Sequence, residues 1–173
     1  MQNYVNFSVC TSHALDFTCT FYIVDISNKQ KNKLLGIYSI LPAFSDVEDS
    51  LSNLQTANIR LYALSNGTAD AVEKLLVNAN VRDYFLDIVS VDDLKIFKPN
   101  PAIYKYFLKK TGSTANDTWL ISSNPFDVIG VISAGMKAAW IKRSDDMLFD
   151  PWKIQPTVTV NILFELEKTI LCD

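Results

Sequence analysis

The spacing of apolar residues divides the chain into a helical first part and a second part in which strands and helices alternate. Between residues 14 and 22, and again between residues 33 and 41, apolar side chains recur at helical intervals. A polar stretch at residues 28–32 separates the two stripes, and Pro42 ends the region. Two helices without a sheet bury too little apolar surface for a core of their own. We therefore expect residues 1–42 to pack as an appendage on the rest of the chain.

After residue 45, short apolar runs alternate with amphipathic helical segments. The runs are largely uninterrupted by polar residues, which is typical of parallel strands that are covered on both faces. Strands that alternate with helices indicate a parallel, right-handed α/β sheet, and we expect it to form the core at residues 43–173. Strands are expected at residues 59–64, 88–91, 118–121, 137–141 and 157–160.

Residue types at the expected helix ends support this assignment. Asn100 is a good N-cap and Pro101 suits the first helical position. Gly135 is expected just after the end of a helix. Three more helix starts are expected at Thr68, at Ser45 through a capping box with Glu48, and at Asn161.

Composition narrows the function classes. A chain of 173 residues, 49% of them hydrophobic, has enough apolar surface for one domain and an appendage. The net charge of −3 gives no indication of a nucleic-acid partner. The chain has no apolar run long enough to cross a membrane and no signal peptide, so we expect a cytoplasmic protein without a membrane partner.

Cysteine and histidine are too few for a catalytic or metal cluster built on them. Cys10, Cys19 and Cys172 are widely spaced and odd in number, as expected of free thiols in a reducing compartment. His13 is the only histidine and lies in a predicted helix. A histidine-based triad or a multi-histidine metal site is therefore nearly excluded.

Polar residues follow three of the expected strands. They are Ser65 with Asn66, then Lys98, and then the stretch from Ser122 to Asp127. Because the carboxyl ends of parallel strands share one edge of a sheet, these groups are expected to meet in one crevice. Lys98 could neutralise a carboxylate or a developing negative charge, and Ser65 with Asn66 could donate to a substrate carboxylate. Asp127 could accept from Lys98 or orient a water as general base.

Each of these residues also has an ordinary structural interpretation. Ser65 and Asn66 could belong to a capped strand–helix turn, and Lys98 could be a surface lysine. Ser122 and Asn124 could be turn residues, and Asp127 could be the N-cap of a helix. The recurrence of polar groups at three strand ends favours a functional site.

Together these stretches resemble a known set of motifs. Leu64-Ser65-Asn66-Gly67, Lys98-Pro99 and Ser122-Ser123-Asn124-Pro125-Phe126-Asp127 are similar to the second, third and fourth motifs of the haloacid dehalogenase superfamily, and most similar to those of its type II L-2-haloacid dehalogenases. The resemblance covers nearly the whole chain. It implies a Rossmann-like three-layer α/β core and makes residues 1–42 a partial helical cap. Further similar stretches are residues 4–7, 14–19, 44–51 and 139–143.

The resemblance implies a reaction. In that family an aspartate displaces halide from C2 of a small 2-haloacid, and water hydrolyses the resulting ester to a 2-hydroxy acid with inversion at C2. Ser65 and Asn66 would bind the substrate carboxylate or position the nucleophile. Lys98 would hold the nucleophile, Ser122 and Asp127 would surround it and the hydrolytic water, and Asn124 would contact the same region.

The resemblance also implies an apolar pocket and a homodimer. Phe7 and Phe126 would line the pocket around the halide, and Phe126 stands where the family usually has tryptophan. Tyr104 matches a polar position near the site. From its sequence context alone, Phe7 could equally be a core residue. The family needs no metal or cofactor, and it commonly dimerises, partly through its cap helices.

One part of the family pattern is absent from these 173 residues. The first motif, a strand that ends in the nucleophilic aspartate, and the cap arginine that receives the halide would precede Met1. We therefore expect the chain as written to be inactive by the covalent route, and its sheet to lack a central strand. Asp25 follows the apolar residues 21–24 but lacks the usual Gly-Thr after it, and is expected at the end of a cap helix. A longer cellular protein and a remnant that closes its sheet by association both remain open.

Two other functions remain as alternatives. A phosphatase of the same superfamily would need the same aspartate and Mg²⁺ held by a second acid, whereas Val128 follows Asp127 here. A non-catalytic protein could retain Ser65, Asn66 and Lys98 as a binding site for small carboxylates.

Overall fold

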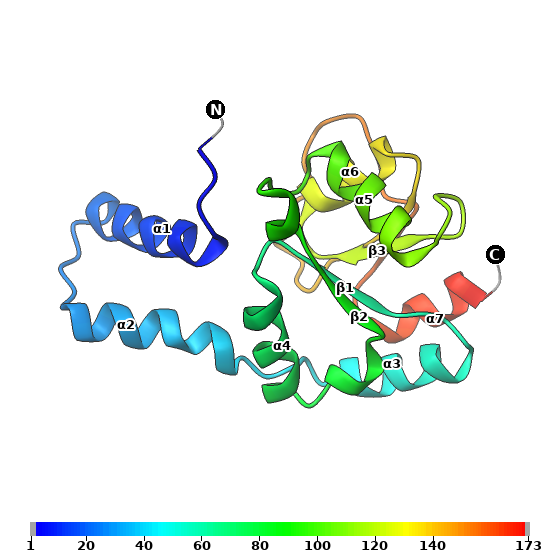
Figure 1. Ribbon diagram of the computed structural model, residues 1–173, viewed down its shortest axis with the longest axis horizontal. Coiled ribbons are helices and arrows are strands. Elements are labelled where there is room, and N and C mark those ends of the chain that lie inside the picture. Colours follow the sequence, from blue (N-terminus) through cyan, green and yellow to red (C-terminus); the bar gives the residue numbers. More distant parts are fainter. Residues whose placement is uncertain (1–2, 172–173) are drawn as a thin grey trace. The chain divides into compact units, whose positions relative to one another are not determined.

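The computed structural model describes residues 3–171, which fold into two compact units (Figure 1). The first unit consists of Met1–Ala43 with Leu61–Lys95, and the second of Phe44–Arg60 with Ile96–Asp173. Each unit is built around its own parallel sheet. No helix within residues 3–171 combines the length and apolar character needed to span a bilayer.

The first unit joins a pair of helices to a two-stranded sheet. Strands β1 and β2 run parallel, with Tyr62 opposite Asp87 and Ser65 opposite Ser90. Helix α4 follows β1 and packs on both strands. The elements are α1 (Phe7–Phe21), α2 (Asn28–Ile37), η1 (Tyr38–Ile40), β1 (Tyr62–Ser65), α4 (Ala69–Asn78), η2 (Arg82–Tyr84), β2 (Asp87–Ser90) and η3 (Val91–Leu94).

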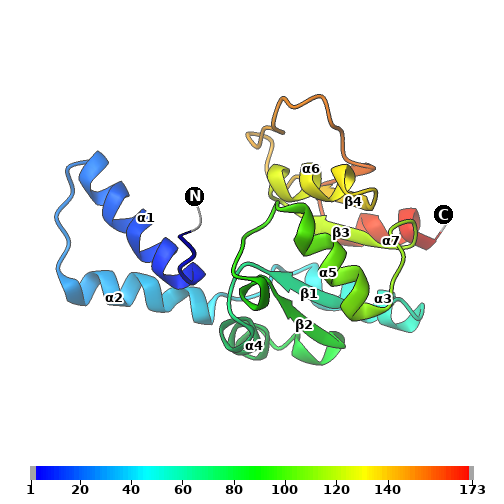
Figure 2. The ribbon, with the colours of Figure 1, turned by 45° about the horizontal axis from the view of Figure 1, so that its top comes forward.

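Helices α1 and α2 form a hairpin, visible in two views (Figures 1 and 2). The side chain of Asn6 caps α1, and Ser27 with Gln30 forms a capping box at α2. No residue of either helix is buried. The two predicted helices are therefore confirmed. Asp25 lies in the connection between them and does not end a strand.

The second unit is a three-stranded parallel sheet in the order β3-β4-β5. Helix α6 packs on β3 and β4 and contacts α5, whereas α3 and α7 pack together. Figure 1 shows these two pairs on opposite sides of β3. The elements are α3 (Val47–Thr56), α5 (Pro101–Thr111), β3 (Trp119–Ser122), α6 (Pro125–Ser133), β4 (Lys137–Ile141), β5 (Val158–Val160) and α7 (Phe164–Leu171).

The core of the second unit is centred on α6 and β4. Val128 and Val131 of α6 are fully buried, as are Ala138 and Ala139 of β4. Burial of branched side chains against small strand residues brings helix and sheet into close contact. Leu166 of α7 is fully buried as well.

An ion pair ties three elements of this unit together. Arg143, which follows β4, donates to both carboxylate oxygens of Asp46, at 2.8 and 2.7 Å. The Leu163 amide, just before α7, donates to Asp46 Oδ2 at 2.6 Å. Because Asp46 directly precedes α3, its carboxylate connects the start of α3 to Arg143 after β4 and to Leu163 just before α7.

Most predicted helix ends are confirmed. The Asn100 side chain accepts from the Ala102 amide, with Pro101 opening α5, and Gly135 adopts a positive φ of 81° after α6. Thr68 caps α4. Two predictions are wrong. Asp46 rather than Ser45 precedes α3, and α7 begins at Phe164, three residues beyond Asn161, whose amide instead donates to Glu165.

The predicted α/β class with parallel strands is confirmed, and all five predicted strands are present. They form two sheets instead of one. Within residues 3–171, β1 pairs only with β2, and β3 pairs only with β4. Each of these two strands therefore has one edge that pairs with no strand among the described residues. The division into a cap at 1–42 and a core at 43–173 stays a prediction.

Candidate functional site

Three of the predicted residues meet in the second unit. Lys98 Nζ donates to Asp127 Oδ2 at 3.0 Å, and the Ser122 hydroxyl donates to the same oxygen at 3.1 Å. The two charged side chains keep only 10% and 3% of their surface exposed. A buried carboxylate needs such partners because its charge is costly to remove from water.

The local sequence explains this meeting. Ser122 is the last residue of β3, and Asp127 lies in the first turn of α6, where the helix N-terminus favours negative charge. Asn124 precedes the helix, and its amide donates to the Ser122 hydroxyl oxygen at 3.0 Å. Asn124, not Asp127, is the N-cap by position. The interpretation of Asp127 as an N-cap is therefore wrong, because Asp127 lies inside the first turn of the helix.

Two buried polar atoms beside this ion pair have no hydrogen-bond partner among the described residues. They are Asp127 Oδ1 and the Tyr104 hydroxyl. Burial, and then the negative charge of Asp127, raise the pKa of Tyr104, so its phenol stays neutral and is a donor. A neutral phenol and a carboxylate oxygen supply one donor and one acceptor for a small polar group.

Gly130 creates the space for Tyr104. A Cβ atom at this position would lie 2.4 Å from the Tyr104 hydroxyl oxygen and 2.6 Å from Pro99 Cβ. Both contacts are much closer than van der Waals distance. A residue without a side chain is therefore needed one turn after Asp127.

Phe126 and Asn124 lie at the surface of the same unit. Phe126 is 41% exposed and is therefore not a core residue. The loop before it is held by the Trp140 indole N–H, which donates to the Ser123 carbonyl at 3.1 Å. Trp140 in turn packs edge-on against Phe149. The loop between β3 and α6 thus has a defined position.

The remaining predicted residues belong to the first unit. Ser65 ends β1, and its hydroxyl oxygen accepts from the Gly67 amide at 3.0 Å, which leaves the hydroxyl proton available to donate. Asn66 follows and is half-buried. Phe7 opens α1 and is 44% exposed, so the interpretation of Phe7 as a core residue is wrong. Its role in a substrate pocket stays a prediction.

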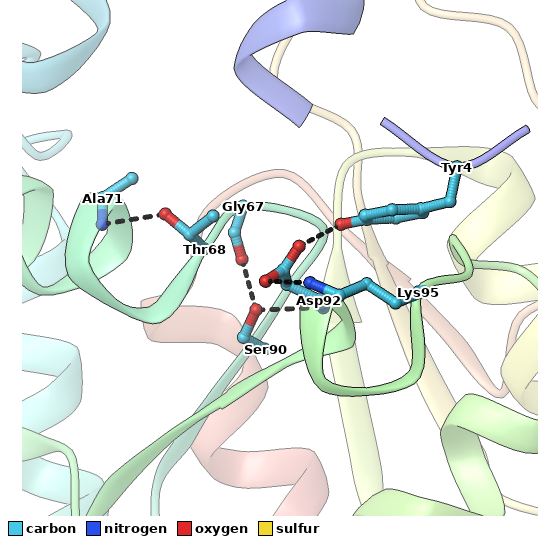
Figure 3. Close-up of polar contacts among 7 residues, drawn as sticks. All are labelled: Tyr4, Gly67, Thr68, Ala71, Ser90, Asp92 and Lys95. Atoms are coloured by element: carbon cyan, nitrogen blue, oxygen red, sulfur yellow. Dashed lines mark hydrogen bonds and ion pairs between the residues drawn. The ribbon is translucent and has the colours of Figure 1, made fainter. Parts of the chain in front are cut away.

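Sequence reasoning missed one polar cluster in this unit, formed by Tyr4, Asp92 and Lys95 (Figure 3). The Tyr4 hydroxyl donates to Asp92 Oδ1 at 2.5 Å, and Lys95 donates to Asp92 Oδ2 at 2.8 Å. In the sequence, Tyr4 belongs only to the similar stretch 4–7. No local pattern predicts its contact with a residue 88 positions away.

The chain matches known proteins over most of its length. The profile of the family described as haloacid dehalogenase-like hydrolase matches residues 10–141. An (S)-2-haloacid dehalogenase from Pseudomonas sp. strain YL is 31% identical over 170 residues, covering 95% of this chain and 73% of the relative. (S)-2-haloacid dehalogenase 4A from Burkholderia cepacia is 33% identical, covering 96% and 71%.

A solved structure agrees with these matches. It is that of the L-2-haloacid dehalogenase from Xanthobacter autotrophicus with chloropropionic acid covalently bound. It superposes with a TM-score of 0.88 at 25% identity, covering 97% of this chain and 77% of that one. The resemblance found in the motifs is therefore confirmed, and the chain belongs to the haloacid dehalogenase-like hydrolase family.

Proposed function

We propose that this chain binds small 2-haloacids or related small carboxylates and carries the binding and water-activating residues of a hydrolytic dehalogenase. The observation that carries the proposal is the buried Lys98–Asp127 pair with Ser122, next to two buried polar atoms that have no hydrogen-bond partner within residues 3–171. The names of the relatives support the substrate class, because they are (S)-2-haloacid dehalogenases.

Each group has a role in this proposal. Ser65 and Asn66 donate to the substrate carboxylate, and Lys98 neutralises the negative charge of a carboxylate nucleophile. Asp127 accepts a proton from the water that attacks the aspartyl ester. The Tyr104 hydroxyl donates to that water or to the ester oxygen. Asn124 contacts the nucleophile region, and Phe7 with Phe126 surrounds the carbon–halogen bond.

The first step of the reaction needs one more residue. A carboxylate must displace the halide from C2, and its ester is then cleaved to the 2-hydroxy acid and the free carboxylate. Asp25 does not stand at a strand end, so we do not assign it this role. The proposal for these residues is therefore binding, and turnover requires a carboxylate nucleophile in addition.

Calorimetry tests the proposal without requiring turnover. (S)-2-chloropropionate is expected to give saturable binding heat with the wild-type chain, and Ser65→Ala is expected to weaken binding about tenfold, because a hydrogen bond to a charged group contributes roughly 1.5–3 kcal/mol. Ser133→Ala is the matched control, since Ser133 is exposed near the other end of α6. Absence of saturable heat, or equal affinity in Ser65→Ala, would contradict the proposal.

A phosphatase is the second candidate and is less well supported. Phosphatase chemistry in this superfamily uses Mg²⁺ held by a second acid, whereas the residue after Asp127 is the fully buried Val128. Titration with inorganic phosphate, with and without Mg²⁺, separates the two. The phosphatase would be favoured if, in the presence of Mg²⁺, the chain bound phosphate more tightly than it binds 2-chloropropionate.

We also propose that a second copy of the chain packs on the α1–α2 hairpin and that the protein is cytoplasmic. No residue of α1 or α2 is buried, and the large apolar side chains of Phe17, Phe21 and the adjoining Tyr38 are more than half exposed. An apolar surface of this kind favours association, and four helices in a bundle would cover it.

Cys10 and Cys19 are free thiols, which is consistent with a reducing compartment, while Cys172 lies outside the described residues. An apolar groove in the hairpin is lined in part by Thr11, Leu15, Thr18, Leu34, Tyr38 and Leu41.

A further inference from the structure

The cluster of Tyr4, Asp92 and Lys95 joins two segments that are far apart in the sequence. Asp92 accepts from Tyr4 at one carboxylate oxygen and from Lys95 at the other. The Lys95 ammonium also lies over the Tyr4 ring, 5.4 Å from its centroid. The three side chains thus contact one another pairwise, which fixes the segment before α1 against the turn after β2 (Figure 3).

The cluster continues as a chain of hydrogen bonds to Ser65. The Asp92 amide donates to the Ser90 hydroxyl oxygen at 3.1 Å, and that hydroxyl donates to the Gly67 carbonyl at 2.7 Å. The Gly67 amide then donates to the Ser65 hydroxyl oxygen at 3.0 Å. Ser90, in the middle of this chain, is only 2% exposed, so its hydroxyl has few alternative partners.

This series of hydrogen bonds has a predicted substrate-binding residue at one end and another close to its other end. Tyr4 lies three residues before Phe7, and Asn6 between them caps α1 through the Val9 amide. At the other end, the bond from Gly67 orients the Ser65 hydroxyl. Side chains that bind a substrate need such support, because a small displacement of a donor weakens its hydrogen bond.

We propose that Tyr4 and Asp92 are positioning residues that hold Ser65 and Phe7 in one fixed arrangement. The inference rests on the proposed function in that Ser65 and Phe7 bind the substrate. Tyr4 and Asp92 act only through other residues. The Asp92 carboxylate, held by Tyr4 and Lys95, fixes the Asp92 backbone, whose amide acts on Ser65 through Ser90 and Gly67. Tyr4 acts on Phe7 through the start of α1. Lys95 neutralises Asp92 and holds the Tyr4 ring.

Hydrogen exchange of the backbone amides, without ligand, tests the coupling directly. Asp92→Asn and Tyr4→Phe are expected to speed exchange at residues 65–68 and 7–10 by about tenfold, the effect of losing one charge-assisted hydrogen bond. Exchange at Ile88 and Val89, which precede Ser90 in β2, is expected to stay unchanged, whereas a purely structural defect would speed exchange throughout the unit.

Two control variants match these substitutions. Asp16→Asn breaks the exposed Asp16–Lys31 pair in the helical hairpin, whose atoms lie 2.6 Å apart, and Tyr22→Phe removes an exposed tyrosine hydroxyl at the end of α1. Neither is expected to alter exchange at residues 65–68. If Asp92→Asn leaves these amides as slow as the controls do, or speeds exchange uniformly, the positioning role is wrong.

Ligand affinity supplies a second readout. In a double-mutant cycle, Asp92→Asn and Ser65→Ala are expected to weaken binding of (S)-2-chloropropionate by less than the product of their single effects, because both act on the same hydroxyl. Independent effects would overturn the positioning role. If the wild-type chain does not bind the acid at all, the proposed function fails, and the exchange experiment alone decides whether Asp92 positions Ser65.

Discussion

The ammonium of Lys98 and the carboxylate of Asp127 form an ion pair of 3.0 Å that is almost closed to solvent. They lie 29 positions apart in the sequence, and the bond joins the segment before α5 to the first turn of α6. A buried pair of this kind contributes little to stability by comparison with apolar residues, but loss of one partner leaves a charge without compensation. Such a pair is therefore more readily explained by function than by stability.

Lys98→Met is expected to destabilise the protein by roughly 3–5 kcal/mol, because Asp127 would keep a buried charge with Ser122 as its remaining side-chain donor. The double variant Lys98→Met/Asp127→Asn is expected to recover much of this loss. Urea denaturation of the wild type, both single variants and the double variant measures the cycle. Additive effects would show that the two charges do not stabilise each other in the folded protein.

Gly130→Ala is expected to destabilise the fold by about 1–3 kcal/mol, although alanine normally stabilises a helix relative to glycine. The new Cβ would lie 2.4 Å from the Tyr104 hydroxyl and 2.6 Å from Pro99. Addition of Tyr104→Phe is expected to restore part of the stability, since it removes one of these contacts. A thermal midpoint higher than that of the wild type would contradict the packing described for Tyr104.

Asp46 is expected to make stability fall in acid. Burial by itself would raise the Asp46 pKa, but hydrogen bonds from the Leu163 amide and from Arg143 outweigh it and lower the pKa. The folded protein therefore binds this proton less readily than the unfolded chain does. The stabilisation is present above the unfolded-state pKa of about 4 and is lost as pH falls through the lower folded-state value.

Asp46→Asn tests this pH dependence. At pH 7 the variant is expected to be less stable by roughly 1.5–3 kcal/mol, the contribution of hydrogen bonds to a charged group. The difference in stability between the variant and the wild type is expected to narrow below about pH 4, where the wild-type carboxylate becomes protonated. Thermal midpoints of both proteins measured at several pH values check the prediction. A difference that stays constant down to the most acidic sample would show that the charge of Asp46 is not responsible.

The proposed packing of a second copy on the α1–α2 hairpin predicts that Leu34→Glu abolishes this association. Leu34 lines the groove between α1 and α2 and is partly exposed, so an association through this face would bury the new charge without a partner. Asn32→Glu adds the same charge at an exposed neighbouring position outside the groove and is the control. Sedimentation equilibrium of the two variants and the wild type gives their masses. A wild-type monomer, or a dimer that survives Leu34→Glu, would exclude this face as the interface.

Local signals in the sequence predicted much of the fold. The strand at residues 137–141 and the start of α5 at Asn100 and Pro101 match the structure, because apolar runs and capping residues act over a few neighbouring positions. The wrong helix starts, at Ser45 and Asn161, have a shared cause. Each residue could cap a helix, but Asp46 precedes α3, and its carboxylate accepts from Arg143 and from the Leu163 amide just before α7. Local spacing cannot predict a contact between residues so far apart.

The candidate site was only partly predictable. The groups expected to converge at strand ends were Ser65 with Asn66, Lys98, and the stretch from Ser122 to Asp127. Within the second unit the structure brings Lys98, Ser122 and Asp127 together. The buried Tyr104 hydroxyl, which has no partner in the described part of the chain, and the Tyr4–Asp92 bond could not be predicted. Both depend on which side chains become buried or adjacent in three dimensions, and sequence spacing contains no information on either.

The most direct test of the account is an NMR titration of the isotope-labelled chain with (S)-2-chloropropionate. The account predicts saturable shifts of the Ser65 and Asn66 amides and of the resonances around Tyr104 and Asp127, with the amides of exposed α2 unaffected. Shifts that do not saturate, or that gather along the groove between α1 and α2, would contradict it. The chain would then not use these residues to bind a small halogenated acid.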